Sequence, residues 1–169
     1  MKRTIPSKTA VKKVAIQKAA VKKIAAKKTA AKKATAKKAV IAQRLPSLSL
    51  WSDINFSGRR LRFRGNIGVR SLVVFNYNDV LSSFEVDGTN QSTLVLFQDA
   101  NYQGARRVYR GSTAIANLGD FNDLASSFVL SRGRLSDAQI NRIQNRGTAP
   151  GNFAEVFSNG VLRRSKSVK

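Results

Sequence analysis

The chain has 169 residues, 42% of them hydrophobic, and its 31 Lys and Arg outnumber its 9 Asp and Glu, for a formal net charge of +22. One modest core is expected, together with an anionic partner or anionic surroundings. The absence of Cys and His removes disulfides, thiol nucleophiles, imidazole bases and the usual zinc or iron ligands, so no enzyme is expected. No long apolar stretch or signal-peptide pattern occurs, which predicts an intracellular protein of the cytoplasm or nucleoid.

Residues 1–47 are predicted to form a basic arm and linker. The first 44 residues contain 15 Lys or Arg and no acid. The lysines recur every five residues, which spreads them around a helix without an apolar stripe, so we expect a disordered or conditionally helical arm. Such an arm binds phosphates through counterion release, without sequence preference. The lysines assigned to nucleic acid are Lys12, Lys13, Lys18, Lys22, Lys23, Lys27, Lys28, Lys32, Lys33, Lys37 and Lys38.

The composition of the arm carries a resemblance of its own. Its Ala-Lys-Lys-Thr-Ala and Ala-Lys-Lys-Ala-Thr runs resemble the tails of linker histones and bacterial histone-like proteins. That resemblance implies DNA as the partner. A tail that binds anionic lipid or another acidic polymer, or that only improves solubility, stays open as an alternative.

The composition changes at Leu48, where arginine replaces lysine and β-branched and aromatic residues begin to alternate with turn formers. In Arg60–Arg64, apolar side chains at Leu61 and Phe63 alternate with three arginines, which is the period of a half-buried strand. The arginine side is interpreted as a solvated face or as an extension of the polyanion surface. Further short strands are predicted at Val73–Phe75, Phe84–Val86, Leu94–Phe97 and Phe128–Leu130.

One sequence unit occurs twice. LWSDINFSGRRLRFRG at 50–65 matches LFQDANYQGARRVYRG at 96–111, and the loop NDVLSS at 78–83 matches NDLASS at 122–127. In the second block, Arg106 and Arg110 are predicted on the polar side and Arg107 and Tyr109 on the other. Gly58 and Gly104 follow an aromatic residue where a hairpin needs positive φ. The repeat predicts an all-β sandwich built from two like motifs, at 48–88 and 94–131.

These residues resemble the paired Greek-key motifs of the βγ-crystallins, in particular their microbial calcium-binding members. The resemblance covers residues 48–131 and implies one all-β, βγ-crystallin-like sandwich of two Greek-key motifs with two Ca²⁺ sites. Loops rich in Asn, Asp and Ser offer the oxygen ligands that calcium prefers, whereas the simpler alternative is that they are only turns. With one carboxylate in each site, the affinity is expected to be micromolar or weaker.

The resemblance implies that each site draws on both loops. One site would use Asp79, the carbonyl of Val80 and Ser126, and the other Asp123, the carbonyl of Leu124 and Ser82. A further carbonyl, from Ser52 or Gln98 in the hairpins, completes each site in the family. Which hairpin serves which site stays open at this point.

Residues 132–169 form a C-terminal extension that the resemblance does not cover. A capping Ser136 and isoleucines spaced by three predict a short helix at 136–143, and residues 152–157 are either a strand or a hydrophobic tether. Three functions fit the chain. The first is a non-enzymatic calcium-binding module tethered to a DNA-binding arm; the others are a structural virion or coat component and a protease inhibitor of crystallin fold.

Overall fold

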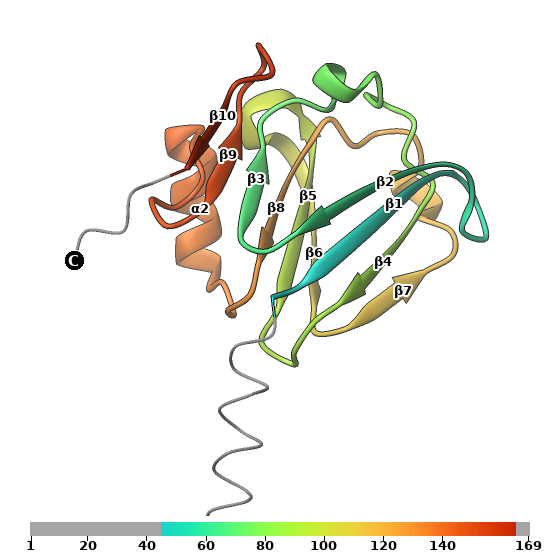
Figure 1. Cartoon of the computed structure of the whole chain (residues 1–169), viewed down its shortest axis with the longest axis horizontal. Coiled ribbons are helices and arrows are strands. Elements are labelled where there is room, and N and C mark those ends of the chain that lie inside the picture. Colours follow the sequence, from blue (N-terminus) through green and yellow to red (C-terminus); the bar gives the residue numbers. More distant parts are fainter. Residues whose placement is uncertain (1–44, 165–169) are drawn as a thin grey trace, which may run out of the picture. The chain divides into compact units, whose positions relative to one another are not determined.

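The computed structural model describes residues 45–164, so the arm and its lysines lie outside the described residues. Within this range the strands form two sheets, ordered β2-β1-β4-β7 and β10-β9-β3-β8-β5-β6 (Figure 1). The elements are β1 Ser47–Asp53, β2 Ser57–Arg64, β3 Ile67–Val69, η1 Leu72–Phe75, β4 Ser83–Asp87, β5 Thr93–Asp99, η2 Ala100–Tyr102, β6 Gln103–Arg110, β7 Thr113–Ile115, η3 Gly119–Phe121, β8 Ser127–Ser131, α2 Asp137–Arg146, β9 Ala154–Val156 and β10 Leu162–Arg164.

The two motifs exchange one strand each. The first motif places β1, β2 and β4 in the first sheet but sends β3 to pair with β8 in the second. The second motif places β5, β6 and β8 in the second sheet and sends β7 to pair with β4 in the first. The predicted sandwich of two Greek keys is therefore confirmed.

Each motif begins with a hairpin whose turn follows the prediction from the repeat. Gly58 and Gly104 adopt φ of 76° and 74°, a region where a side chain would be strained. The aromatic ring before each glycine packs edge-on or tilted against the ring at the end of the preceding strand. The centroids are 5.4 Å apart for Trp51 and Phe56, and 5.6 Å apart for Phe97 and Tyr102. These ring contacts hold each hairpin turn against the strand that precedes it.

The strand predicted at Val73–Phe75 is wrong, because these residues lie in the 3-10 helix η1. The Ser71 hydroxyl accepts a hydrogen bond from Val73 N at the start, and Asn76 ends the helix in the left-handed conformation. Leu72 N also donates to the carbonyl of Ser126 across the domain. β-branched residues favour strands only where a partner strand is available, and here caps and a long-range bond override that preference.

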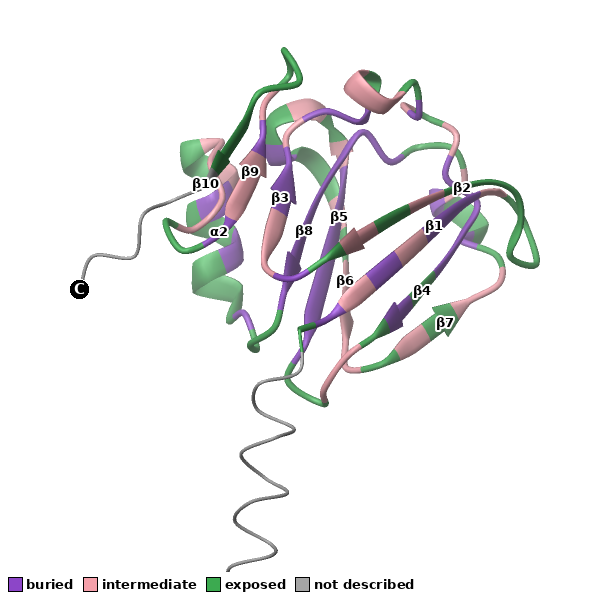
Figure 2. Cartoon of the chain, in the orientation of Figure 1, coloured by how far each residue is buried: buried purple, intermediate pink, exposed green. Residues whose placement is uncertain are grey.

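The main core fills the space between the sheets. It takes alternate residues from both of them, including Leu48 and Leu50 from β1 and Leu94 and Leu96 from β5, all at most 1% exposed. Strand β5 differs from β1 because its other face is buried too. Val95 and Phe97 are fully buried there, and Figure 2 shows β5 and β8 buried along most of their length. A second apolar layer must therefore cover the outer face of this sheet.

That layer is the C-terminal extension. The predicted helix is confirmed as α2, which begins with a capping box in which Ser136 and Gln139 bond to each other's backbone N–H. Its buried Ile140 and Ile143 pack on Val95 and Val129 in one cluster. The stretch at 152–157 combines both predicted roles, since Phe153 joins this cluster and Ala154–Val156 forms β9, parallel to β3.

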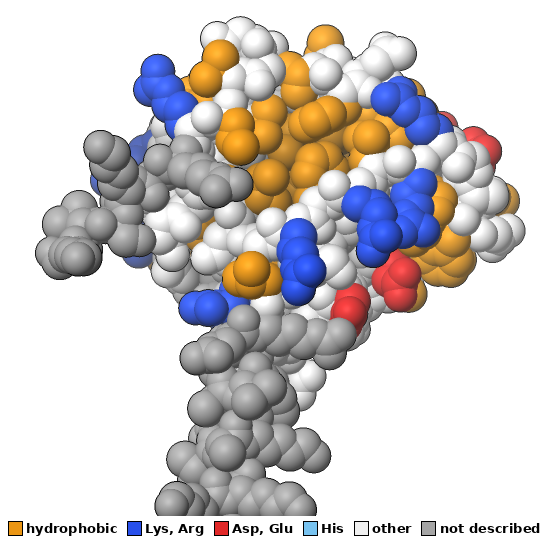
Figure 3. Space-filling view, in the orientation of Figure 1, with side chains coloured by type: hydrophobic (Ala, Val, Ile, Leu, Met, Phe, Trp, Pro, Cys, Tyr) orange, Lys and Arg blue, Asp and Glu red, His pale blue; other side chains and the backbone are white. Residues whose placement is uncertain are grey.

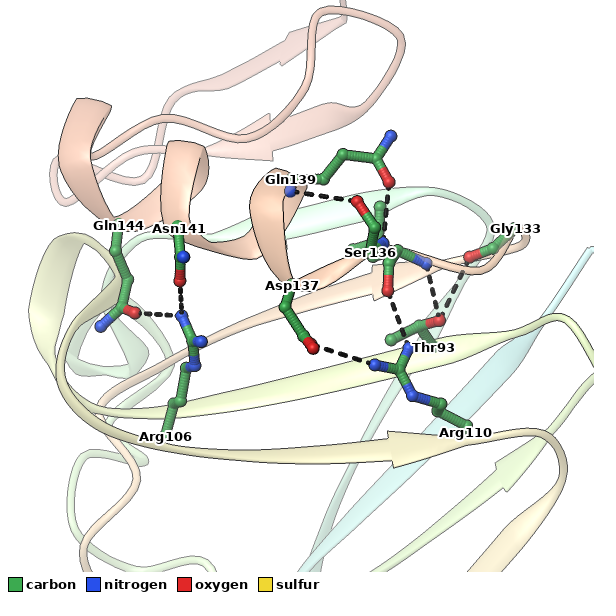
Figure 4. A network of polar contacts seen from close by, with 10 residues as sticks. Thr93, Arg106, Arg110, Gly133, Ser136, Asp137, Gln139, Asn141 and Gln144 are labelled. Carbon is green, nitrogen blue, oxygen red and sulfur yellow. Dashed lines mark hydrogen bonds and ion pairs between the residues drawn. The ribbon is translucent and has the colours of Figure 1, made fainter.

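A polar seam joins the edge strand β6 to this extension (Figure 4). Arg106 donates to the side chains of Asn141 and Gln144 on α2. Arg110 donates to the Leu135 carbonyl at 2.7 Å and pairs with Asp137 at 3.2 Å. Arg106 and Arg110 therefore share one side of β6, as predicted, but that side faces the extension instead of open solvent.

The outer face of the first sheet carries no such layer among the described residues. Arg60, Arg62 and Arg64 are exposed on β2, with Leu61 and Phe63 half-buried on the other side, as the period of two predicts. Figure 3 shows basic side chains over β2 and acidic ones beside them. None of the helices within residues 45–164 is long and apolar enough to cross a membrane.

Candidate metal centre

The two repeated loops lie between a 3-10 helix and a strand, and they share one unusual backbone feature. Asp79 and Asp123 adopt φ of 54° and 55°, the left-handed region that Asp tolerates better than most residues. The preceding asparagine holds each carboxylate, since Asn78 Nδ2 donates to Asp79 Oδ2 and Asn122 Nδ2 donates to Asp123 Oδ2 at 2.5 and 2.7 Å. The other oxygen of each carboxylate, Oδ1, contacts the opposite loop.

The loops are joined reciprocally through their backbones. Asp79 N donates to the Ala125 carbonyl at 3.3 Å, and Asp123 N donates to the Leu81 carbonyl at 3.0 Å. These two bonds bring the carboxylate of each loop beside the start of the serine pair in the other.

The side chains meet in the same crossed arrangement. Ser126 Oγ donates to Asp79 Oδ1 at 3.0 Å, and Ser82 Oγ lies 3.3 Å from Asp123 Oδ1. Residues 41 to 47 positions apart in the chain thus form each pair. The structure thus brings Asp79 beside Ser126 and Asp123 beside Ser82, the residues predicted to share a calcium site, while Val80 and Leu124 follow the two aspartates directly in the loops.

The structure also relates each hairpin to a site. Ser82 Oγ donates to the Ser52 carbonyl at 2.8 Å, so the first hairpin lies beside the Asp123 and Ser82 pair. Ser126 N donates to the carbonyl of Phe97, the residue before Gln98, just as Ser82 N donates to that of Trp51, the residue before Ser52. The second hairpin accordingly lies beside the Asp79 and Ser126 pair.

Sequence reasoning missed the part played by the second serine of each loop. Ser83 and Ser127 are fully buried, and their hydroxyls donate to the carbonyls of Asp53 and Asp99, both at 2.6 Å. Each hydroxyl also accepts a backbone N–H from the hairpin turn, at Phe56 or Tyr102. These serines join each loop to its hairpin. The repeat of both serines in each motif is the sequence signal from which two separate roles could have been inferred.

The polar atoms that meet between the two loops are oxygens, which are the ligands that hard cations such as Ca²⁺ prefer. No cluster of three or more His, Cys, Asp or Glu side chains that could hold a metal ion occurs within residues 45–164, so each crossed pair brings a single carboxylate beside its serine hydroxyl. Oxygens bound to one Ca²⁺ at about 2.4 Å, at angles of about 70° to 90°, lie about 2.8 to 3.4 Å apart. The contacts among Ser52, Ser82 and Asp123 fall in that range, as does the contact of Ser126 with Asp79.

Two further side chains, one beside each loop, bear on cation binding. The Arg59 guanidinium donates to the carbonyls of Phe75 and Asn76, just before the first loop, and brings a positive charge near it. Next to the second loop, Asn122 Oδ1 is a buried side-chain atom with no hydrogen-bond partner among the described residues. An acceptor without a donor beside the Asp123 carboxylate is compatible with a cation in this loop.

Parts of the chain are similar to known proteins. The family model described as Peptidase inhibitor family I36 matches residues 47–109, and no curated protein matches the chain. Among solved structures, the chain is similar to a domain from work on the evolution of the eye lens βγ-crystallin fold, at 26% identity over 52% of this chain and 87% of that one, with a TM-score of 0.46.

Two further structures show the same likeness. A βγ-crystallin from Ciona intestinalis is 25% identical over 48% of this chain and 95% of its own, with a TM-score of 0.42. A βγ-crystallin domain from Clostridium beijerinckii is 20% identical over 51% and 98%, with a TM-score of 0.43. By its strand order and its strand exchange, the described domain has the βγ-crystallin-like fold of two Greek-key motifs.

Proposed function

We propose that the chain is a non-enzymatic calcium-binding module of βγ-crystallin type, tethered to an arm that binds nucleic acid. The observation that carries the calcium proposal is the crossed pairing of Ser126 with Asp79 and of Ser82 with Asp123. Each pair places a carboxylate and a hydroxyl from different loops at the spacing of a calcium coordination sphere. Ca²⁺ would act as a stabilising link between the two motifs, because each site exists only when both loops are folded together.

Calcium is expected to bind at two sites and to raise the melting temperature. At a free concentration 100 times the Kd, one site adds about 2.7 kcal/mol to the free energy of unfolding. For a domain of this size that corresponds to a rise on the order of 10 °C. Calorimetric titration of the full chain with Ca²⁺ and thermal unfolding with Ca²⁺ or a chelator would measure both effects. Absence of heat and of any thermal shift would refute the calcium proposal.

The arm is proposed to supply most of the affinity for nucleic acid. Its lysines, together with the absence of any acid in the first 44 residues, support a salt-dependent contact with phosphates. Deleting residues 1–44 is expected to lower the affinity for duplex DNA at least about 100-fold at low salt and to flatten the salt dependence. Fluorescence anisotropy at several salt concentrations would measure this. Equal affinity of both proteins would move the contact to the folded domain.

Peptidase inhibition is the second candidate, and the match of residues 47–109 to a peptidase inhibitor family favours it. That match covers the first motif and part of the second, so an inhibitory contact would come from the sandwich and its hairpins. A panel of serine, cysteine and metallopeptidases assayed with the full chain decides this candidate. Inhibition that survives removal of calcium would separate it from the first proposal.

A further inference from the structure

A pocket of about 410 Å³ lies where the C-terminal extension meets the second sheet. Glu155 on β9 is paired with Gly68 on β3 and with Arg163 on β10, so side chains at these positions share one face of the sheet. The loop Thr148–Gly151 lies over the same face, since a side chain added at Gly68 would meet Ala149. The pocket is lined by this loop and by Arg70, Phe153, Glu155, Phe157 and Arg163.

The only carboxylate that lines this pocket uses one of its oxygens, Oε1, for three hydrogen bonds. Glu155 Oε1 accepts hydrogen bonds from Ala149 N at 2.8 Å, from the Tyr102 hydroxyl at 3.0 Å and from Arg70 Nε at 3.1 Å. Arg70 makes its hydrogen bond through Nε, and its terminal nitrogens form no hydrogen bond to a residue within 45–164. The Arg163 side chain forms no hydrogen bond or ion pair to any residue in that range. The pocket therefore holds more donor capacity and positive charge than its own residues use.

Both arginines are held against one aromatic ring. The guanidinium carbon of Arg70 lies 4.4 Å from the centroid of Phe157, and that of Arg163 lies 5.0 Å from it. Cation–π contact positions each guanidinium, at about 0.5 to 1 kcal/mol for an exposed case. Two like charges on one ring also repel each other, and an anion bound beside both would relieve that repulsion.

We propose that this pocket binds a phosphate group. Guanidinium groups match the geometry of phosphate oxygens and form charge-assisted hydrogen bonds with them. Thr148 also lines the pocket and carries a hydroxyl, which is a neutral donor. Phe157 is already in contact with the two arginines, so the pocket suits the phosphate itself more than a stacked base. The inference depends neither on the calcium sites nor on the arm.

A neighbouring hollow bears on the source of the phosphate. It has a volume of about 290 Å³, shares Thr148–Gly151 with the first pocket and is lined by Gln139, Arg142 and Arg146, with no acid. Phosphate alone or a phosphomonoester would need only the first pocket. The backbone of a nucleic acid would also contact the arginines of the second hollow, which shares the loop with the first pocket.

The test uses the full chain labelled with ¹⁵N, in calcium-free buffer to prevent calcium phosphate from forming. Inorganic phosphate is expected to shift the amides of Thr148, Gly151 and Phe157 saturably, whereas chloride at the same ionic strength does not. Arg163→Gln is expected to weaken the affinity for phosphate at least about tenfold, since it removes one of the two guanidinium groups. Arg134→Gln is the matched control, because Arg134 is exposed and makes no described side-chain contact.

Three results would overturn the proposal. They are the absence of saturable shifts with phosphate, equal binding by Arg163→Gln, and equal weakening by Arg134→Gln. Where phosphate binds as expected, a short DNA duplex and Arg146→Gln identify the source. If Arg146→Gln weakens the duplex-induced shifts at Thr148 but leaves phosphate binding unchanged, the natural ligand is a nucleic-acid backbone. If the duplex produces no shifts at Thr148 and Phe157, the natural ligand is a small phosphate compound.

Discussion

Replacing Glu155 with Ala is expected to lower the free energy of unfolding by about 3 kcal/mol or more. The Glu155 side chain is 13% exposed and the Arg70 side chain 19%, so their ion pair is largely shielded from water. The substitution would leave that guanidinium without its carboxylate and the hydroxyl of Tyr102, a fully buried residue, without its acceptor. It would also release Ala149 N and with it the loop that carries the extension over β3.

Chemical denaturation of the full chain measures this loss of stability, and two further variants serve as comparisons. Glu155→Gln keeps an oxygen acceptor but removes the charge, so it should cost less than Glu155→Ala. Glu85→Ala is the matched control, because the Glu85 side chain is exposed on β4 and forms no described hydrogen bond or ion pair; it should change stability by no more than about 0.5 kcal/mol. Equal small effects at Glu155 and Glu85 would contradict the role assigned to this network.

The Tyr102 hydroxyl makes the stability of the fold depend on pH through the same network. Its burial, and then the Glu155 carboxylate, raise the pKa of Tyr102 above the ordinary value of 10.0. A raised pKa in the folded state stabilises the fold fully below the unfolded pKa, and this contribution is lost as the pH rises from about 10 through the folded value.

Crossed pairs of substitutions are expected to separate the two calcium sites. Asp79→Asn and Ser126→Ala act on one site, so the double variant should keep one site of unchanged affinity. Asp79→Asn combined with Ser82→Ala should impair both sites, since Ser82 contacts Asp123. Each substitution is expected to weaken its own site roughly tenfold or more, which is about 1.4 kcal/mol. Asn is chosen because it tolerates the positive φ of Asp79.

Calorimetric titration of the two double variants gives the measurement, with Glu85→Gln as a control for the loss of one carboxylate elsewhere. If each site instead belonged to a single loop, Asp79→Asn with Ser82→Ala would be the variant that keeps one intact site. That result would contradict the reciprocal arrangement while leaving calcium binding itself in place.

Much of the candidate site is predictable from residues that are close together in the sequence. The repeated loops, the glycines of the two hairpins and the alternation around Phe63 depend on residues close together in the chain, and all three lie in the structure as predicted. The crossed pairing of serine and aspartate joins residues more than 40 positions apart. It was predictable only through the resemblance to a family, because no local rule specifies which distant loop a side chain meets.

The interior of the second sheet shows a signal that sequence reasoning left unused. Leu94, Val95, Leu96 and Phe97 are apolar without alternation, whereas β1 and β4 place serines and acids on their outer face. A strand that is apolar at both parities is buried on both faces. This pattern at β5 already required a covering layer, and the isoleucines of α2 together with Phe153 supply it.

Residues close together in the chain are enough to specify the two motifs, their hairpins, their oxygen-rich loops and the capped helix of the extension, because the contacts of these elements are short-range. Features that depend on distant partners follow only from the folded arrangement. It placed Val73–Phe75 in a 3-10 helix, turned Arg106 and Arg110 toward α2, and gathered Arg70, Glu155 and Arg163 around one pocket. Propensity and periodicity act over a few residues, whereas burial and charge pairing are set by whichever elements the chain brings together.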